Sequence, residues 1–248
     1  MQRIKCIISY DGTLFSGYQV QVNARTVQGE LERVLATMHK RVVKVTASGR
    51  TDAGVHALGQ VIHFDTTLNI PASKWVQALN AMLPADIAIL HAEYVPDSFH
   101  ARYEAKGKQY RYVIDLGKVR NPLKRNYTYH YPYAVDIDRI RAACQYAVGT
   151  HDFSSFCAAN TSVVDKVRTI HSITCEQQGN ELVLTYTGNG FLYNMVRILT
   201  GTLIEIGNGA RKPEEMQAII ASCNRSDAGK TAPAQGLYLQ EVYYSEAE

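Results

Sequence analysis

The chain of 248 residues repeats one order of strands and helices, and this repetition constrains its fold more than any other feature. Hydrophobic spacing in residues 1–100 predicts strand, helix, strand, strand, helix, strand. The predicted elements are strands over 3–10, 42–46, 60–64 and 87–94, and helices from 27 onward and over 73–82. Thr26 can cap the first helix. Its apolar stripe is Val27, Leu31, Val34, Leu35 and Met38.

Residues 101–248 repeat nearly the same order. Asp136 can cap a helix, and Gly179–Asn180 forms a tight-turn signal between two strands. The predicted strands are 108–114, 167–176, 181–187 and 237–244, and the later helices are 191–206 and 213–223. Each half is therefore predicted to be a ferredoxin-like, RRM-like β-α-β-β-α-β unit. We expect an α+β fold of two domains, 1–100 and 101–248, with mainly antiparallel sheets side by side and a catalytic cleft at their junction.

Composition excludes several protein classes. No run of about 18 apolar residues is present, so no membrane span is predicted. The N-terminus leads directly into a strand pattern without the apolar region of a signal peptide. The five cysteines are odd in number and never spaced Cys-x-x-Cys, which argues against a disulfide framework or a zinc site. The sequence thus favours a reducing, cytoplasmic location.

One segment is strongly basic although the whole chain carries a net charge of only +3. Between residues 102 and 125, eight basic residues stand against Glu104 and Asp115, a local excess of six positive charges. The basic residues are Arg102, Lys106, Lys108, Arg111, Lys118, Arg120, Lys124 and Arg125. Tyrosines lie among them, a mixture that suits a phosphate backbone and unstacked bases. A solvated strand face and loop would have the same composition, so both interpretations stay open.

Familiar cofactor motifs do not match. Residues 49–54 have the glycine spacing of a phosphate loop, but Val55 and His56 stand where Lys and Ser or Thr are required. A second near match ends at Thr231 but has Asn224 in place of its first glycine. Dinucleotide, zinc-protease and serine-hydrolase signatures are absent, and the histidines lack metal-ligand spacing. We therefore expect a mechanism without cofactor, nucleotide or metal.

Asp52 is the leading candidate for chemistry. It lies in a glycine-bracketed loop between two predicted strands, a place where rigid scaffolds present reactive groups. A carboxylate acts as nucleophile or base only while it is ionised, and a nearby arginine favours that form. Arg50 and Arg197 are the candidate partners. From the residues alone, the loop could also be an ordinary hairpin and Arg197 a surface charge.

Two sets of tyrosines alternate along predicted strands. Tyr110 shares one face with Tyr112 and Ile114, where it could stack on a base, act as acid or base, or belong to the core. A second set alternates in the same way and is interpreted as structural or as part of an interface. This set is Tyr127, Tyr129, Tyr131 and Tyr133.

Seven segments in order resemble the tRNA pseudouridine synthase A family. They are residues 49–57 (GRTDAGVHA), 59–64 (GQVIHF), 99–103 (FHARY), 110–112 (YRY), 152–156 (DFSSF), 189–197 (NGFLYNMVR) and 231–239 (TAPAQGLYL). The resemblance covers essentially the whole chain. It implies that uridines 38, 39 and 40 of the tRNA anticodon arm are isomerised to pseudouridine. It also implies a homodimer in which one tRNA touches both subunits.

The resemblance also implies roles for individual residues. Asp52 matches the catalytic aspartate, Tyr110 a residue that contacts the target base, Arg50 an arginine linked to base flipping and Arg197 the arginine paired with the aspartate. A tRNA-contacting segment matches Phe99, His100, Ala101, Arg102 and Tyr103. Residues 160–164 lack the basic residue that some relatives use against RNA.

The implied reaction detaches uracil at N1, rotates it and rejoins it through C5, so it needs no redox cofactor, nucleotide or metal. The base must first leave its stack, which costs a few kcal/mol. Asp52 could attack the sugar, add to the pyrimidine ring or help to form a glycal, and the sequence leaves the three open. The alternatives to this enzyme are an RNA-binding module without catalysis and an aspartate-dependent glycosyl enzyme that releases the base.

Overall fold

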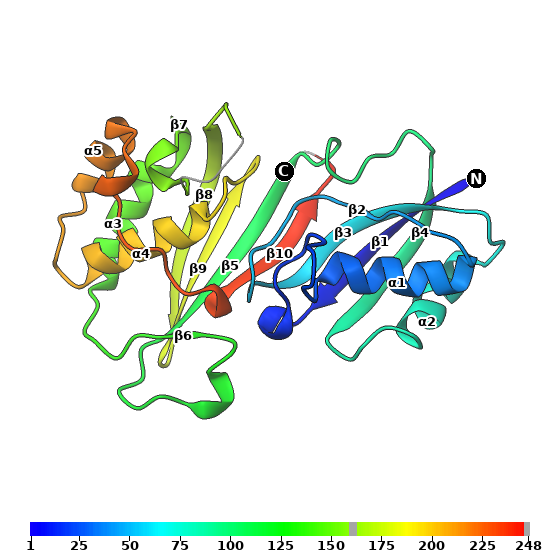
Figure 1. The fold of residues 1–248 in the computed structure, drawn as a ribbon. Coiled ribbons are helices and arrows are strands. Elements are labelled where there is room, and N and C mark those ends of the chain that lie inside the picture. Colours follow the sequence, from blue (N-terminus) through cyan, green and yellow to red (C-terminus); the bar gives the residue numbers. More distant parts are fainter. Residues whose placement is uncertain (159–162, 246–248) are drawn as a thin grey trace. The chain divides into compact units, whose positions relative to one another are not determined.

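The computed structural model describes residues 1–158 and 163–245, which form two compact units (Figure 1). Unit 1 contains Met1–Lys106 and the C-terminal segment from Tyr238, and unit 2 contains Gly107–Leu237. In the structure, residues 101–106 and the last strand belong to the first unit, whereas the sequence suggested a single division after residue 100. Of the segment 160–164, residues 160–162 lie outside the described residues.

Unit 1 has the predicted order of strands and helices. Its elements are β1 (Gln2–Tyr10), η1 (Gly12–Leu14), α1 (Val27–His39), β2 (Thr46–Ala47), β3 (His56–Thr66), α2 (Ala72–Asn80), β4 (Ile87–Val95) and β10 (Leu237–Tyr243). The strand order is β4-β1-β3-β10, with β2 against β3. The pairs are antiparallel except β3 with β10, where Tyr238 lies opposite His56 in a parallel register.

Both helices of unit 1 cover the same face of its sheet. Ile4 of β1 is fully buried and pairs with Phe64 of β3, so these side chains share one face. Trp75 of α2 packs edge-on against Phe64 with ring centroids 5.4 Å apart, and His39 of α1 stacks on Trp75 at 6.1 Å. The predicted cap of α1 is confirmed: Gly29 N–H donates to Thr26 Oγ1 at 3.2 Å, a contact worth about 1 kcal/mol.

The strands of unit 2 form mainly antiparallel pairs and carry helices on one face. Its elements are β5 (Gly107–Asp115), η2 (Pro122–Lys124), β6 (Tyr129–His130), α3 (Ile137–Ala147), β7 (Gly149–Asp152), η3 (Ser154–Phe156), β8 (Val167–Gln178), β9 (Glu181–Gly188), α4 (Met195–Gly207), α5 (Glu215–Ser222), η4 (Arg225–Asp227) and η5 (Ala234–Gly236). The order is β5-β9-β8-β7, and the short β6 runs parallel to β5. Tyr186 of β9 is fully buried and hydrogen-bonds Thr200 of α4 at 2.8 Å. The predicted α+β class is therefore confirmed.

Local signals in unit 2 act as the sequence predicted. Asp136 caps α3 by accepting hydrogen bonds from the N–H groups of Asp138 and Arg139 at 3.0 and 3.1 Å. The turn between β8 and β9 places Gly179 at φ +59°, a left-handed conformation that suits glycine.

Two predicted elements differ from the structure. The strand expected over 42–46 is reduced to β2, because only Thr46 and Ala47 pair with β3; Val43 and Val45 are buried without being strand residues. The helix expected from Phe191 begins at Met195, since Asn194 adopts φ +60° and ends the preceding loop. β6 and β7 were not predicted, because segments of two and four residues carry little periodicity.

Candidate functional site

Asp52 lies in a tight turn between β2 and β3, within residues 49–55, which we call the Asp52 loop. Val55 N–H donates to the Asp52 carbonyl at 3.1 Å, and Gly54 sits at φ +77° in the turn position that favours glycine. Asp52 is partly exposed, while its neighbour Thr51 is buried. The backbone is therefore fixed while the carboxylate stays within reach of a substrate.

Residues 11–25, which follow β1, support the Asp52 loop from one side, and we call them the supporting segment. Tyr18 N–H donates to the Thr51 carbonyl at 3.0 Å, and Gly54 N–H donates to the Phe15 carbonyl at 3.4 Å. Gly12 packs directly on the loop, since a Cβ at this position would come within 2.0 Å of the Val55 carbonyl oxygen. Only glycine allows this approach.

Buried side-chain hydrogen bonds hold the two ends of the loop. The Tyr10 hydroxyl lies 2.8 Å from Thr51 Oγ1 in a buried contact. Ser48 donates to Gln60 Oε1 at 2.6 Å, and Gln60 Nε2 donates to the Gly49 carbonyl at 2.9 Å. Burial raises the pKa of Tyr10 to about 12, so its hydroxyl keeps its proton at neutral pH.

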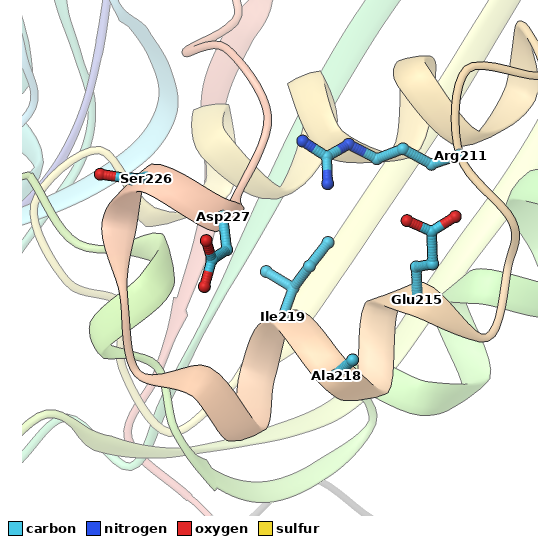
Figure 2. A pocket seen from close by; sticks show the side chains of 6 residues that line it. All are labelled: Arg211, Glu215, Ala218, Ile219, Ser226 and Asp227. Atoms are coloured by element: carbon cyan, nitrogen blue, oxygen red, sulfur yellow. The ribbon is translucent and has the colours of Figure 1, made fainter.

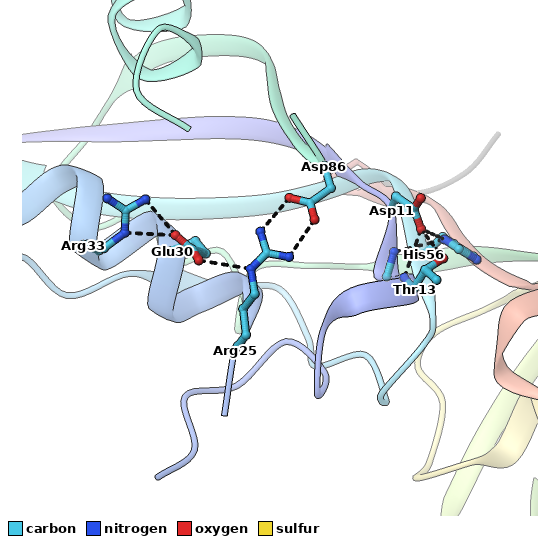
Figure 3. Close-up of polar contacts among 8 residues, drawn as sticks. Asp11, Thr13, Arg25, Glu30, Arg33, His56 and Asp86 are labelled. Carbon is cyan, nitrogen blue, oxygen red and sulfur yellow. Dashed lines mark hydrogen bonds and ion pairs between the residues drawn. The ribbon is translucent and has the colours of Figure 1, made fainter. Parts of the chain in front are cut away.

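His56, the first residue of β3, holds the C-terminal end of the Asp52 loop in place. Its ring is almost fully buried and stacks on Tyr238 with centroids 4.8 Å apart. Gly12 N–H donates to His56 Nδ1 at 3.0 Å, and Asp11 Oδ1 lies 3.2 Å from the same nitrogen (Figure 3). Asp11 also accepts from Thr13 N–H at 2.9 Å, which fixes the start of the supporting segment.

An ion-pair network fixes the other end of the supporting segment. Arg25 binds Asp86 through two hydrogen bonds of 2.6 and 2.9 Å and reaches Glu30 of α1 at 3.2 Å (Figure 3). Its guanidinium lies 4.2 Å above the Phe15 ring. Since the Phe15 carbonyl accepts from Gly54, the network ties α1 and the start of β4 to the backbone that carries Asp52.

The predicted partner arginines differ in their surroundings. Arg50 is exposed on the Asp52 loop. Arg197 is half-buried in the first turn of α4, where Nε donates to the Ala232 carbonyl at 2.8 Å and Nη1 donates to Asn194 Oδ1 at 2.9 Å. Ala232 N–H also donates to the Arg197 carbonyl at 3.0 Å. Arg197 is therefore a held side chain and not a loose surface charge.

Tyr110 lies on β5 with its ring buried. It packs edge-on against Phe191 with ring centroids 5.2 Å apart and an angle of 82°. Its neighbour Tyr112 donates to the Pro233 carbonyl at 2.7 Å, and burial holds the Tyr112 pKa far above its usual range. An aromatic wall can pack a core and can also stack on a base, so this environment fits two of the three predicted interpretations of Tyr110.

Residues 99–103, the predicted tRNA-contacting segment, form a turn that we call the 99–103 turn. Phe99 and Ala101 are buried, at 8% and 0% exposure, whereas Tyr103 is 78% exposed and Arg102 is also exposed. The His100 ring stacks on Tyr103 at 4.1 Å. The five residues thus divide into two buried anchors and three side chains that solvent reaches.

A second histidine of β3 holds this turn. Ala101 N–H donates to His63 Nδ1 at 3.1 Å, and Arg3 donates to the Phe99 carbonyl at 2.8 Å. Tyr244 closes the turn by donating to the Ala101 carbonyl at 2.6 Å. Burial, helped by the charge of Arg3, lowers the pKa of His63 to about 4.

The structure groups the predicted residues by unit. Asp52, Arg50 and the 99–103 turn belong to unit 1, and Tyr110 and Arg197 belong to unit 2. Sequence reasoning missed the residues that hold them. These are Tyr10, Gly12, Ser48, Thr51, His56, Gln60, His63 and Ala232. Thr51 and His56 lie in segment 49–57, and Gln60 and His63 lie in segment 59–64. Both segments carry the family resemblance, and this was the signal available for these four residues.

The described residues contain no group of three His, Cys, Asp or Glu side chains arranged to hold a metal ion. Within the same part of the chain, every helix is too short or too polar to cross a bilayer.

A hollow of about 350 Å³ lies between α5 and η4, beside Arg211 (Figure 2). Arg211 is bound to Glu205 at 2.8 Å. None of the predicted site residues lines this hollow.

Comparison with known proteins identifies relatives over nearly the whole chain. A family model described as tRNA pseudouridine synthase matches residues 6–104 and 143–245. The tRNA pseudouridine synthase A proteins of Lysinibacillus sphaericus and Anoxybacillus flavithermus are 57% and 56% identical, over 98% of this chain and 100% and 99% of their own lengths. That of Bacillus subtilis is 53% identical over 98% of this chain and 99% of its own. A solved structure titled "Crystal Structure of a Cbf5-Nop10-Gar1 Complex" aligns with a TM-score of 0.34 and 12% identity over 82% of this chain and 54% of its own, too distant to carry an argument.

Proposed function

Because the chain belongs to the tRNA pseudouridine synthase family, we propose that Asp52 carries out the reaction of that family on uridines 38, 39 and 40 of the tRNA anticodon arm. The protein is an enzyme that isomerises uridine to pseudouridine in tRNA. The observation that carries the proposal for Asp52 is the Asp52 loop, which fixes one partly exposed carboxylate through backbone and buried side-chain contacts.

The fixed loop suits an isomerisation. Uracil leaves the ribose through N1 and returns through C5, so the reacting partners are a base and a sugar that must stay together in one site. A carboxylate held at one position can act in both halves of this exchange, as nucleophile toward the sugar or the ring or as the base that leads to a glycal. The support from Gly12, Tyr10 and Gln60 limits how far Asp52 can move between the two steps.

Arg50 and Arg197 are proposed to serve Asp52 in different ways. Arg50 is exposed on the same loop, and its long side chain is free to enter the space left by a flipped base, which offsets part of the unstacking cost. Arg197 is tethered to Asn194 and Ala232, which suits a cation that keeps a carboxylate ionised. Tyr110 is proposed to stack on the target base, supported by its edge-on contact with Phe191.

The proposal is tested by mapping pseudouridine in an unmodified tRNA after incubation with purified protein. Asp52→Asn should lower pseudouridine formation at all three positions by about 10⁴-fold or more, the usual loss for a reacting group, while tRNA binding largely survives. Asp138→Asn is the matched control, because its ion pair with Arg141 is on the surface. Full activity of Asp52→Asn would remove Asp52 as the catalyst, and release of free uracil would indicate a base-releasing enzyme.

We further propose that the enzyme works as a cytoplasmic homodimer, with one tRNA touching both subunits. Support for the compartment comes from the five cysteines, all of which are free thiols. Sedimentation of the protein with and without tRNA tests the assembly: a stoichiometry of one tRNA per single chain, with no dimer at any concentration, would contradict it.

A further inference from the structure

A loop of unit 2 outside the predicted site carries an unbalanced positive charge. The chain leaves β5 at Asp115 and returns where Tyr131 N–H donates to the Asp115 carbonyl at 2.8 Å. His130 also holds the two ends of this segment together, because its ring forms a hydrogen bond of 2.7 Å with the Gly117 carbonyl. Residues 116–130, which we call the basic loop, thus form a compact Ω-like loop that ends in β6 (Figure 1).

The basic loop has no carboxylate of its own. Asp115 and Asp136 flank a stretch that contains four cations and no Asp or Glu; the cations are Lys118, Arg120, Lys124 and Arg125. Lys124 is paired with Glu181 at 2.7 Å. Among the described residues the other three cations have no carboxylate partner, and all three are exposed. Their charge is therefore available to an anionic partner.

An aromatic hollow continues from the end of the basic loop. It has a volume of about 640 Å³, and we call it the tyrosine hollow; it is lined by Tyr131, Tyr133, Ala134, Asn208, Gly209 and Ala210. The rings of Tyr131 and Tyr133 lie 5.2 Å apart at 66°, and Tyr133 is 68% exposed. A Cβ at Gly209 would meet no atom within 4 Å, so this wall leaves open space.

The polar groups of the hollow suit an uncharged ring better than a phosphate. Asn208 Nδ2 donates to the Tyr131 hydroxyl at 2.8 Å, so that hydroxyl keeps its own proton for an acceptor on a ligand. Asn208 is also the residue that follows α4, and the C-terminal end of a helix disfavours anions. A base edge can therefore enter the hollow, while phosphates are better placed on the arginines of the basic loop.

We propose that the basic loop and the tyrosine hollow together bind an unpaired nucleotide of the RNA substrate, outside the reacting site. Its base stacks on Tyr133 in the hollow, and the adjoining phosphates contact Arg120 and Arg125. Cations beside exposed aromatic rings are the combination by which proteins hold single-stranded nucleic acid. Val119 and Leu123, 84% and 82% exposed, add apolar surface that suits the faces of unstacked bases. The inference rests on the proposed function, because it assumes a tRNA substrate.

The test measures the affinity for unmodified tRNA at several salt concentrations. Tyr133→Ala should weaken tRNA binding by about 5- to 150-fold, the range for loss of one stacked base. Tyr133→Phe keeps the aromatic ring and should bind tRNA like the wild type. Arg120→Ala/Arg125→Ala should lower the slope of log affinity against log salt by about 1.4, as expected for two lost phosphate contacts. Lys74→Ala, an exposed cation on α2, is the control for loss of one charge. A photoreactive phenylalanine at position 133 should crosslink to the RNA.

The outcomes separate this inference from the proposed function. Wild-type protein that forms no pseudouridine would contradict the proposed function itself. Normal pseudouridine formation, with Tyr133→Ala and Arg120→Ala/Arg125→Ala binding tRNA like wild type, would overturn the inference alone. Sedimentation decides the remaining case: weaker tRNA binding that accompanies dissociation of the protein into single chains would assign the surface to a second copy and would also overturn it. Tyr133 is exposed, so its truncation should leave the melting temperature unchanged.

Discussion

Each of two loops in unit 1 is held by a buried histidine of β3, but the loops differ in how their other side chains are arranged. His56 and His63, both buried on β3, each accept a backbone N–H at Nδ1, from Gly12 at 3.0 Å and from Ala101 at 3.1 Å. The first bond supports the Asp52 loop and the second the 99–103 turn. Around Asp52 the hydrogen bonds continue into buried side chains, whereas the turn projects three exposed or half-exposed side chains from two buried anchors.

The difference fits the roles that we propose for the two loops. A group that reacts with one atom must be held in place, because a misplacement of about 1 Å can cost 10²-fold in rate. Side chains that contact phosphates tolerate more freedom, since the attraction is long-ranged and not directional. Changes around Asp52 should therefore appear in kcat, and changes in the 99–103 turn should appear in tRNA affinity and its salt dependence.

Among changes to the residues that hold the two loops, Gly12→Ala has the largest expected effect. The new Cβ would lie 2.0 Å from the Val55 carbonyl oxygen, so the Asp52 loop must move. We expect kcat to fall by about 10²-fold, with little change in tRNA affinity. Single-turnover kinetics at saturating enzyme measure the chemical step directly.

Gly179→Ala separates loop displacement from a general cost of replacing glycine. Gly179 has φ +59° but open space around it, so the variant should lose stability without losing kcat. Gly12→Ala with a normal kcat would mean that the supporting segment does not set the position of Asp52.

The next effect is a loss of stability at acidic pH, centred on the 99–103 turn. His63 has a folded pKa of about 4, against 6.5 in a free chain. The unfolded chain therefore binds a proton first as pH falls, so stability is complete above pH 6.5 and declines toward pH 4. The decline is at most about 3 kcal/mol. Urea unfolding at pH 7 and pH 4.5 measures it.

His63→Asn should remove most of this pH dependence, because asparagine can accept the Ala101 N–H without titrating between those values. An unchanged pH profile in the variant would assign the acid sensitivity to other groups.

Local signals made most of the fold predictable. Thr26, Asp136 and Gly179 act within a few residues of themselves, and each does what its type predicts. The prediction failed where the outcome depended on a distant partner. Val43 and Val45 alternate as a strand does, but alternation reports burial, and ladder bonds need a neighbouring strand at the right place.

In the site, too, the prediction succeeded for local features and failed for contacts between distant residues. Asp52 was identified from its loop and from a resemblance, because the motif is continuous in the sequence. Its supports are not continuous: Tyr10 lies 41 positions from Thr51, and Gly12 lies 44 positions from His56. No periodicity or spacing links such pairs. The burial of Phe99 and Ala101 was equally hidden, since both belong to one continuous motif with the exposed Arg102 and Tyr103.

A smaller effect is expected from Tyr10→Phe. The change removes a hydroxyl that lies 2.8 Å from Thr51 Oγ1 in a buried contact, which should cost about 1–2 kcal/mol in the free energy of unfolding. The kcat should fall less than in Gly12→Ala, because the backbone contacts of the loop remain. Thr51→Val provides the second arm of a double-mutant cycle. Additive losses in Tyr10→Phe/Thr51→Val would show that the two hydroxyls do not interact.

The smallest effect separates the 99–103 turn most clearly from the Asp52 loop. Arg102→Ala removes one exposed cation from an anchored backbone and leaves the buried contacts of Phe99 and Ala101 in place. Stability and kcat should be unchanged, tRNA affinity should fall by only a few-fold, and the salt slope should drop by about 0.7–0.9, the share of one phosphate contact. Lys74→Ala, which removes a cation from α2, should leave the slope as it is. If Arg102→Ala lowered kcat at saturating enzyme instead, the turn would act on the position of the substrate and not on its affinity. The two loops would then share one role in catalysis.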